Sequence, residues 1–272
     1  MPLRVAAISF LNPAPLLYSF EHEPAATALR EHYELHYTLP SACAAELLAG
    51  TSDLGLIPIA SLHEVRSILL LVRNPDSLSV ADALKAVRSV AADAASRSSA
   101  AYAHILFEHF HGNKPDFVEQ PADPLAMLAV ADAALLIGDP ALLARERREA
   151  INAAIDEPLL WLDLAQLWRE LTGLPWVAAV WAVRPEALTD VTPQQLIADL
   201  NSSRDAGLAH IEELVAEWTP RLDLAPETIR TYLTRNIHYT LDEDCLKAIR
   251  LFRELAAGIG ALPALDELNL LG

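Results

Sequence analysis

Lysine is scarce in this chain. Only three of its 20 lysine and arginine residues are lysines, against 37 acidic residues, so the formal net charge is −17. Nucleic acids and anionic membrane surfaces are bound through clustered basic side chains. The composition therefore predicts neither of these partners. A small anion would have to be held by a few arginines, hydroxyl groups and backbone N–H groups.

Cysteine is scarce too, and long apolar runs are absent. Cys43 and Cys245 are the only cysteines, and neither stands in a metal-binding or disulfide-framework spacing. No segment provides the roughly 18–20 uninterrupted apolar residues of a membrane span. The apolar run near the N-terminus is broken by Asn12, Pro13 and Pro15 before a signal-peptide core is complete. We therefore expect a reduced protein in the cytoplasm, with no membrane partner.

The sequence also lacks the motifs that bind nucleotides or activate a serine, namely a GxSxG elbow, a GxxxxGK[ST] loop and a GxGxxG turn after a strand. His32, Glu34 and His36 share one face of a predicted strand. No fourth metal ligand accompanies them, so a solvated strand face is the favoured interpretation. We expect neither a cofactor nor a metal.

Short apolar segments alternate with helical patterns along the chain. Segments 4–10, 32–39 and 54–57 have the composition of strands, and a helix predicted to begin at Ser41 ends at Gly50. This order is typical of an α/β protein.

Two parts of the sequence echo each other. Segments 88–92 and 127–137 resemble 4–7 and 47–57, although alanine-rich sequences produce such echoes by chance, so a true duplication stays open. The echo favours two lobes, each a mainly parallel sheet flanked by helices, with ligands bound at the carboxyl ends of the strands. We place lobe one at residues 1–87 and 185–272 and lobe two at 88–184, with a ligand cleft between them.

Two loops carry candidate chemistry. Asn12 follows the first predicted strand, where the alternative is the ordinary turn chemistry of an asparagine before a proline. The loop at 93–99 precedes a predicted helix, and its free backbone N–H groups, three hydroxyl groups and Arg97 favour an anion. Its alternative is simple capping of the helix by Ser96 or Ser98.

Three other positions have strong structural alternatives. Ser41 starts a second helix, where capping alone is sufficient. Asp139 before Pro140 is typical of an N-cap followed by proline at the first helical position, so we assign it that role. Trp176 either lines a pocket or belongs to the core, as aromatic residues on such strands usually do.

Taken in order, several motifs resemble those of the chorismate dehydratase family. They are SFLNPAPL at 9–16, LPS at 39–41, DLGLIP at 53–58, SVA at 89–91, SRSS at 96–99, IGD at 137–139 and TGLPW at 172–176. The resemblance implies a periplasmic-binding-protein-like fold of the second type. It also implies conversion of chorismate to 3-[(1-carboxyvinyl)oxy]benzoate by loss of water, without a cofactor, in the futalosine route to menaquinone. Departures from the family pattern are Phe10, Ser98 and the pair Ile59 and Ala60.

The resemblance also assigns the site. Asn12 is expected at the reacting centre, where it orients the substrate or bonds to the leaving hydroxyl group, because an amide is a very poor base. The residues expected to contact the substrate are Ser9, Ser41, Ile57, Ser96, Arg97, Ser98, Ser99, Gly138 and Trp176.

Two other functions stay open. The related dihydroxynaphthoate-forming enzyme of the same route shares the fold, but its Cys-Pro-Asn-rich loop after the first strand is not found here. A protein that binds or senses a small aromatic or carboxylic acid without turning it over is the alternative from another class. The sequence leaves the oligomeric state open, with a homodimer as one option.

Overall fold

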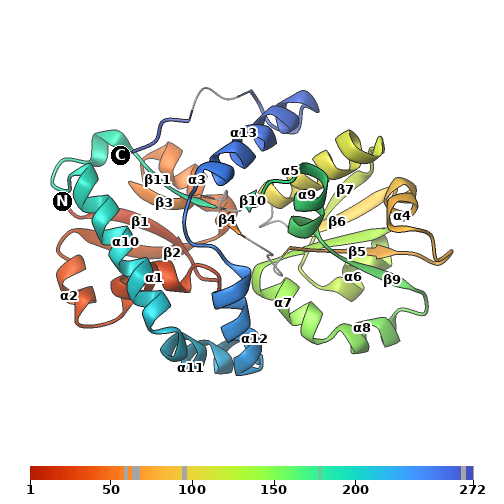
Figure 1. The fold of residues 1–272 in the computed structure, drawn as a ribbon, viewed down its shortest axis with the longest axis horizontal. Helices are drawn as coiled ribbons and strands as arrows, with labels where there is room; N and C mark the ends of the chain where they lie inside the picture. The colour runs from red at the N-terminus through yellow and green to blue at the C-terminus, as the bar shows by residue number, and fades with distance from the viewer. Residues whose placement is uncertain (58–60, 63–67, 94–96, 178, 265–267, 272) are drawn as a thin grey trace. The chain divides into compact units, whose positions relative to one another are not determined.

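The computed structural model describes residues 1–57, 61–62, 68–93, 97–177, 179–264 and 268–271 (Figure 1). The chain forms two compact units, each built from separate stretches of sequence. Unit 1 comprises Met1–Ala60, Ala179–Tyr239 and Asp266–Gly272, and unit 2 comprises Ser61–Ala178 and Thr240–Leu265.

Unit 1 is built on a four-stranded sheet in the order β11-β3-β1-β2. Its strands are β1 (Leu3–Ile8), β2 (Tyr33–Thr38), β3 (Leu54–Ile57) and β11 (Val180–Val183). The first three run parallel, and β11 is antiparallel to β3. In β1 the consecutive residues Val5, Ala6 and Ala7 are all fully buried, so both faces of this central strand are covered, as is usual in parallel sheets.

Two helices of unit 1 pack backbone against backbone. The helices of the unit are α1 (Ala14–Glu21), α2 (Ala25–Leu29), α3 (Pro40–Ala49), α10 (Pro193–Ala209), α11 (Ile211–Leu222) and α12 (Pro226–Thr231), with a 3₁₀ turn η2 (Pro185–Ala187) and a π-helical turn η3 (Tyr232–Asn236). The Ser19 N–H donates to Ser203 Oγ at 3.0 Å across α1 and α10. At Gly207 a Cβ atom would lie 2.3 Å from the Pro15 carbonyl oxygen, so only glycine fits there.

Unit 2 contains a five-stranded sheet in the order β7-β6-β8-β5-β9 and a two-stranded pair, β10 with β4. The strands are β4 (Ser61–Leu62), β5 (Ile68–Arg73), β6 (Ser89–Asp93), β7 (Asp116–Gln120), β8 (Ala133–Ile137), β9 (Leu159–Asp163) and β10 (Trp176–Val177). The helices are α4 (Val80–Ala86), α5 (Arg97–His104) with its π-helical continuation η1 (Ile105–Phe110), α6 (Pro124–Val130), α7 (Gly138–Glu146), α8 (Arg148–Ala154), α9 (Leu164–Thr172) and α13 (Glu243–Gly258). Among the described helices of the two units, none is long and apolar enough to cross a membrane.

The unit boundaries differ from the predicted lobes 1–87, 88–184 and 185–272. β5 and α4 belong to unit 2, because β5 pairs with β8 and β9. β11 belongs to unit 1, because it pairs with β3. The C-terminal helix α13 also lies in unit 2, where it packs against α5 and β10.

Both sheets are mainly parallel, as the sequence predicted, and each is made mixed by one antiparallel strand. In each unit the parallel strands form one block, in the order β2-β1-β3 and β7-β6-β8. The antiparallel strands are β11 in unit 1 and β5 in unit 2. The two units therefore share an arrangement of four strands, to which unit 2 adds β9, and this shared arrangement agrees with the echo in the sequence.

The same three charged positions occur at the amino ends of the parallel strands in both units. In unit 1 the Arg4 N–H and guanidinium donate to the Asp53 carboxylate, and the Arg184 N–H donates to the Asp53 carbonyl at 2.9 Å. In unit 2 the Arg88 N–H donates to the Asp132 carboxylate at 2.9 Å, and the Arg73 N–H donates to the Asp132 carbonyl at 2.9 Å. Asp53 thus joins β1, β3 and β11, and Asp132 joins β6, β8 and β5 in the same way.

Candidate functional site

The carboxyl ends of β1, β2 and β3 gather several of the predicted site residues on one edge of unit 1. Ser9 is exposed directly after β1, Asn12 follows it, and Ile57 is the last residue of β3. The helix α3 begins at this edge, directly after β2. Because ligands of open α/β sheets bind at strand carboxyl ends, this edge is the candidate site of unit 1.

Asn12 presents a buried acceptor at this edge. Its Oδ1 atom is shielded from solvent and has no hydrogen-bond partner within the described chain. The turn around it is closed by the backbone instead, since the Ala14 N–H donates to the Leu11 carbonyl at 3.2 Å. A buried amide oxygen without a partner is uncommon in folded proteins and calls for an explanation. This oxygen is therefore not committed to the turn, and a ligand is a candidate partner for it.

The prediction that Ser41 caps its helix is wrong. The N-cap position of α3 is held by Leu39, which has extended backbone angles, and Pro40 occupies the first helical position. Ser41 therefore lies inside the first turn, and its side chain lies outside the described part of the structure. The other end of the helix agrees with the sequence, since Gly50 caps it with a φ of 71°.

Other predicted site residues lie at the carboxyl ends of β6 and β8 in unit 2. β6 ends at Asp93, and α5 begins at Arg97, so residues 97–99 form the first turn of this helix. Ser99 is buried there, while the side chains of Arg97 and Ser98 and the whole of Ser96 lie outside the described residues. β8 runs parallel to β6 and delivers Gly138 to the same edge.

The segment after β8 differs in detail from the prediction. Gly138 is buried and has a φ of 58°, a left-handed conformation that favours glycine. The helix α7 begins at Gly138 and its N-cap is Ile137, so Asp139 is not the N-cap. Asp139 instead lies buried in the first turn, where the helix dipole favours a carboxylate.

Trp176 lies in an aromatic core of unit 2 and not at a strand carboxyl edge. Its side chain is 1% exposed and stacks on Tyr102, with ring centroids 3.6 Å apart. Phe252 of α13 stacks on Tyr102 at 4.0 Å, and Trp168 meets it edge-on at 4.9 Å. This burial agrees with the core alternative, and direct substrate contact by Trp176 stays a prediction.

Other reactive groups are arranged unfavourably for catalysis. His36 Nε2 lies 2.7 Å from Glu46 Oε2, and Ser52 Oγ donates to the same oxygen at 2.8 Å. A catalytic triad needs the acid and the serine on opposite ring nitrogens of the histidine, but here both approach Nε2. Burial raises the pKa of the Cys43 thiol to about 11, so this cysteine is not an activated nucleophile. Within the described ranges, no group of three histidine, cysteine or acidic residues is arranged to hold a metal.

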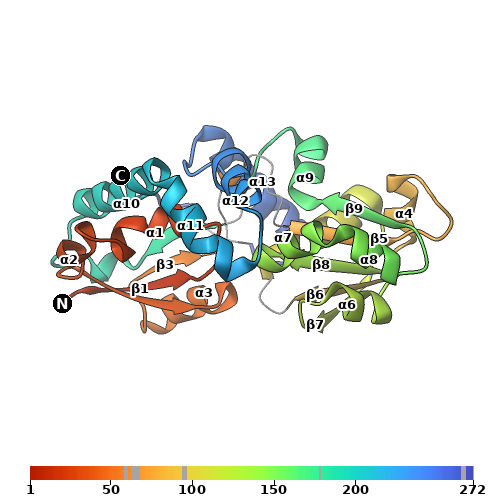
Figure 2. The same cartoon turned by 90° about the horizontal axis from the view of Figure 1, so that it is seen from below.

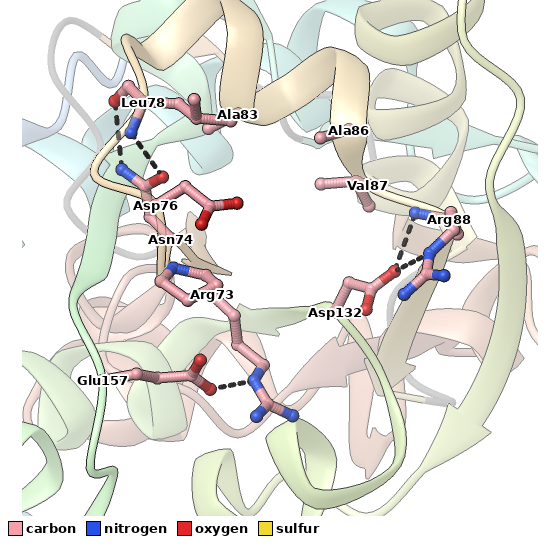
Figure 3. Close-up of a pocket in the computed structure, with 11 residues that line it drawn as sticks. Arg73, Asn74, Asp76, Leu78, Ala83, Ala86, Val87, Arg88, Asp132 and Glu157 are labelled. Atoms are coloured by element: carbon pink, nitrogen blue, oxygen red, sulfur yellow. Dashed lines mark hydrogen bonds and ion pairs between the residues drawn. The ribbon is translucent and has the colours of Figure 1, made fainter.

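A pocket of about 380 Å³ opens at the opposite, amino end of the unit 2 strands (Figure 3). Figure 3 shows Arg73 paired with Glu157 and Arg88 paired with Asp132 on its walls, with Asp76 pointing inward. Both arginines are thus engaged by carboxylates, and the one remaining acidic side chain of the lining, Asp76, disfavours a bound anion. The pocket does not include any of the predicted site residues.

The sequence alone did not indicate Asn236 or Tyr239 as functional residues. The Asn236 Oδ1 atom and the Tyr239 hydroxyl are shielded from solvent and have no hydrogen-bond partner among the described residues, as is true of Asn12 Oδ1. Sequence periodicity indicates which helix positions are buried but not whether a buried polar group finds a partner. No local signal marked these two residues.

Comparison with known proteins agrees with this arrangement. Two solved structures share the fold: the Candida albicans CA3427 gene product, described as having the generic periplasmic binding protein fold (TM-score 0.66, 13% identity, 98% of this chain and 92% of that one), and the Escherichia coli periplasmic aliphatic sulphonate binding protein SsuA (TM-score 0.63, 15% identity, 95% and 86%). The chain therefore has a periplasmic-binding-protein-like α/β fold.

The sequence relatives are more specific. The chain is 31% identical over 222 residues to the chorismate dehydratase of Thermus thermophilus, which covers 78% of this chain and 76% of that protein. A family model described as menaquinone biosynthesis matches residues 3–258. The chain thus belongs to the menaquinone biosynthesis family, as a relative of chorismate dehydratase.

Proposed function

We propose that this protein is a hydro-lyase that converts chorismate to 3-[(1-carboxyvinyl)oxy]benzoate and water, in the futalosine route of menaquinone biosynthesis. The observation that carries the proposal is the 31% identity to a chorismate dehydratase across most of the chain. The buried acceptor of Asn12 at the strand edge of unit 1 supports it.

The chemistry suits the available groups. Chorismate carries two carboxylates and a ring hydroxyl group, and loss of that hydroxyl group with the neighbouring ring proton makes the ring aromatic. Aromatisation supplies the driving force, so the protein has to position the substrate, accept one proton and exclude water. Neither a redox step nor a group transfer is required.

We assign the carboxylates to the helix N-termini and the hydroxyl group to Asn12. In unit 2 the first turn of α5 carries Arg97, Ser98 and Ser99, where free backbone N–H groups and the helix dipole favour an anion. Asn12 acts by orienting the substrate and by hydrogen bonding at the leaving hydroxyl group. The enolpyruvyl carboxylate of the substrate is the candidate proton acceptor, because the Asn12 amide is too weak a base.

The test is incubation of the purified protein with chorismate, followed by absorbance and mass spectrometry. We expect a benzoate spectrum and a product lighter than chorismate by one water. Asn12→Ala should form this product far more slowly, and the surface variant Asn201→Ala, on the exposed face of α10, serves as the matched control. Unchanged chorismate after incubation with folded wild-type protein would rule out the dehydratase.

A binding protein without turnover is the second candidate. It is favoured by the fold shared with a sulphonate-binding protein. In that case chorismate or a related acid would raise the melting temperature of the protein, but its spectrum would not change. The same incubation, monitored by thermal unfolding, separates the two functions.

A further inference from the structure

In unit 1 the Asn12 Oδ1 atom, the Asn236 Oδ1 atom and the Tyr239 hydroxyl are buried and have no hydrogen-bond partner within the described residues. Asn236 is 3% exposed and ends the π-helical turn η3. Buried polar atoms that lose water without gaining a protein partner destabilise a fold, and π-helical turns are frequent at functional sites. Both features indicate that the polar side chains of segment 236–239 serve a function other than stabilising the fold.

The helix contacts show which end of the unit this segment occupies. α1 and α11 lie side by side in the same direction, because Tyr18 bonds Glu213 at 2.6 Å and His22 pairs with Glu217 at 3.3 Å. The N-terminal end of α11 therefore lies toward the N-terminal end of α1, which directly follows Asn12.

α12 then reverses the direction of the chain. Its Arg230 donates to Glu212 at 2.6 and 2.7 Å, at the N-terminal end of α11. η3 continues α12 without a break, so the chain advances from Arg230 past the start of α11, toward the level of Asn12. In Figures 1 and 2 the chain after α12 lies at the end of unit 1 to which the arrows of β1 and β3 point.

From these contacts we infer that Asn236 is a second substrate-contacting residue, which recognises the substrate hydroxyl group together with Asn12 and Tyr239. Two amide oxygens offer acceptors, and a carboxylate would be repelled by them. A hydroxyl group is the complementary partner of Asn236, since its single proton is donated to the Asn236 oxygen. Its lone pairs accept from the Tyr239 phenol and from the amide N–H groups of Asn12. Burial, and next the neighbouring Tyr232, raise the pKa of Tyr239 well above its ordinary value, so the phenol keeps its proton.

This inference rests on the proposed function. It also states which ligands the site prefers, and this preference can be measured without any turnover of chorismate. The expected ligand is a cyclic carboxylate that bears an alcohol, and its dehydrated product lacks that alcohol. Asn236 therefore favours substrate over product, which lowers product inhibition.

The decisive variant is Asn236→Leu, which keeps the size of the side chain and removes its polar atoms. Asn74→Leu is the matched comparison, because Asn74 is equally buried but fully bonded: its Nδ2 donates to the Leu78 carbonyl and its Oδ1 accepts from the Leu78 N–H. We expect Asn74→Leu to lower the melting temperature. Asn236→Leu should leave it unchanged or raise it, while kcat/KM for chorismate falls about 10- to 100-fold, a range typical of one lost contact to a substrate hydroxyl group.

A second variant and a binding measurement test the role of Asn236 independently of its effect on folding. Tyr239→Phe removes one oxygen only, and it should fold normally and lose part of the same kcat/KM. Binding of cyclohexene carboxylate with and without a 4-hydroxyl group, measured by calorimetry, tests recognition even if chorismate is not turned over. Wild type should prefer the hydroxylated probe, and Asn236→Leu should lose that preference.

The inference is overturned if Asn236→Leu melts early, as Asn74→Leu does, yet keeps its kcat/KM per folded molecule. Equal binding of the two probes by wild type would overturn it as well. Absence of chorismate turnover together with a preserved preference for the hydroxylated probe would instead reject only the proposed function.

Discussion

At the residue scale, Asn12 is the residue of unit 1 to which we assign a role in catalysis. The backbone closes its turn, and its buried Oδ1 has no partner in the described chain, so the side chain is not needed to hold the loop. The sequence left turn chemistry and substrate contact open for this residue, and the geometry favours contact.

Replacing Asn12 should therefore impair turnover more than folding. For Asn12→Ala we expect kcat to fall about 10²- to 10³-fold, the usual effect of removing one preorganised hydrogen-bonding group, with a smaller change in KM. Asn12→Asp should bind the dianionic substrate more weakly than wild type but retain more turnover than Ala. Steady-state kinetics and thermal unfolding check both. A variant that melts early with near-full kcat would show that Asn12 is only a turn residue.

Single residues also show where sequence reasoning stops. Gly50 was predicted to cap α3 and does so, because a glycine after a helical pattern has one dominant structural cause. Ser41 and Asp139 were assigned to N-caps and occupy the first turns instead, since the backbone angles of Leu39 and Ile137 place both caps two positions earlier. Leucine and isoleucine are poor N-caps by type, so residue preference favoured Ser41 and Asp139, and only the backbone shows that both helices begin earlier.

At the element scale, the strand segments were predictable and their partners were not. β3 was predicted at its observed bounds. The apolar sequence from Trp176 to Val183 contains two strands, β10 and β11. β10 pairs with β4 in unit 2, while β11 pairs with β3 in unit 1. Apolar composition reports burial, which is similar in both settings, so it indicates neither the partner nor the direction of a strand. The antiparallel direction of β5 was missed for the same reason.

The packing of α1 on α10 yields a prediction at this scale. Gly207→Ala would place a methyl group 2.3 Å from the backbone oxygen of Pro15, which a rotamer change cannot relieve. We expect a loss of about 1–3 kcal/mol in the free energy of unfolding, measured by urea denaturation. Gly258→Ala in α13 is the matched control, because no atom lies within 4 Å of the added Cβ, and it should be neutral or slightly stabilising. Equal effects of the two variants would mean that the helices separate freely at this contact.

At the scale of the whole molecule, the two units repeat one plan with different charge pairing. Asp53 accepts from Arg4 and lies 3.5 Å from Arg184, so two guanidinium groups meet one carboxylate. Asp132 occupies the equivalent position in unit 2. Its partner Arg88 is largely exposed, and the Arg73 guanidinium pairs with Glu157 instead of Asp132. The sequence echo indicated the repeated plan. It could not show that Asp53 and Asp132 would be partnered so differently, because Arg184 and Arg73 come from segments outside the echo and because the Arg88 side chain, unlike that of Arg4, is largely exposed.

This difference predicts unequal effects of neutralising the two aspartates. Hydrogen bonds from Arg4 lower the pKa of Asp53 below its ordinary value. Burial alone would raise the pKa of Asp132, but the N–H and guanidinium of Arg88 outweigh it and lower that pKa too. We expect Asp53→Asn to reduce the free energy of unfolding at neutral pH more than Asp132→Asn does, as measured by urea denaturation.

The pH dependence tests whether the charge itself is responsible. A carboxylate with a depressed pKa stabilises the fold fully above its unfolded pKa of about 3.9, and this contribution is lost as the pH falls through the folded pKa. Asparagine does not titrate, so the gap in unfolding free energy between wild type and Asp53→Asn should be widest near pH 7 and narrow below about pH 4. The gap for Asp132→Asn should narrow in the same direction from a smaller starting value. A gap for Asp53→Asn that stays constant from about pH 7 to pH 3 would mean that side-chain shape, and not the ion pair with Arg4, joins the strands of unit 1.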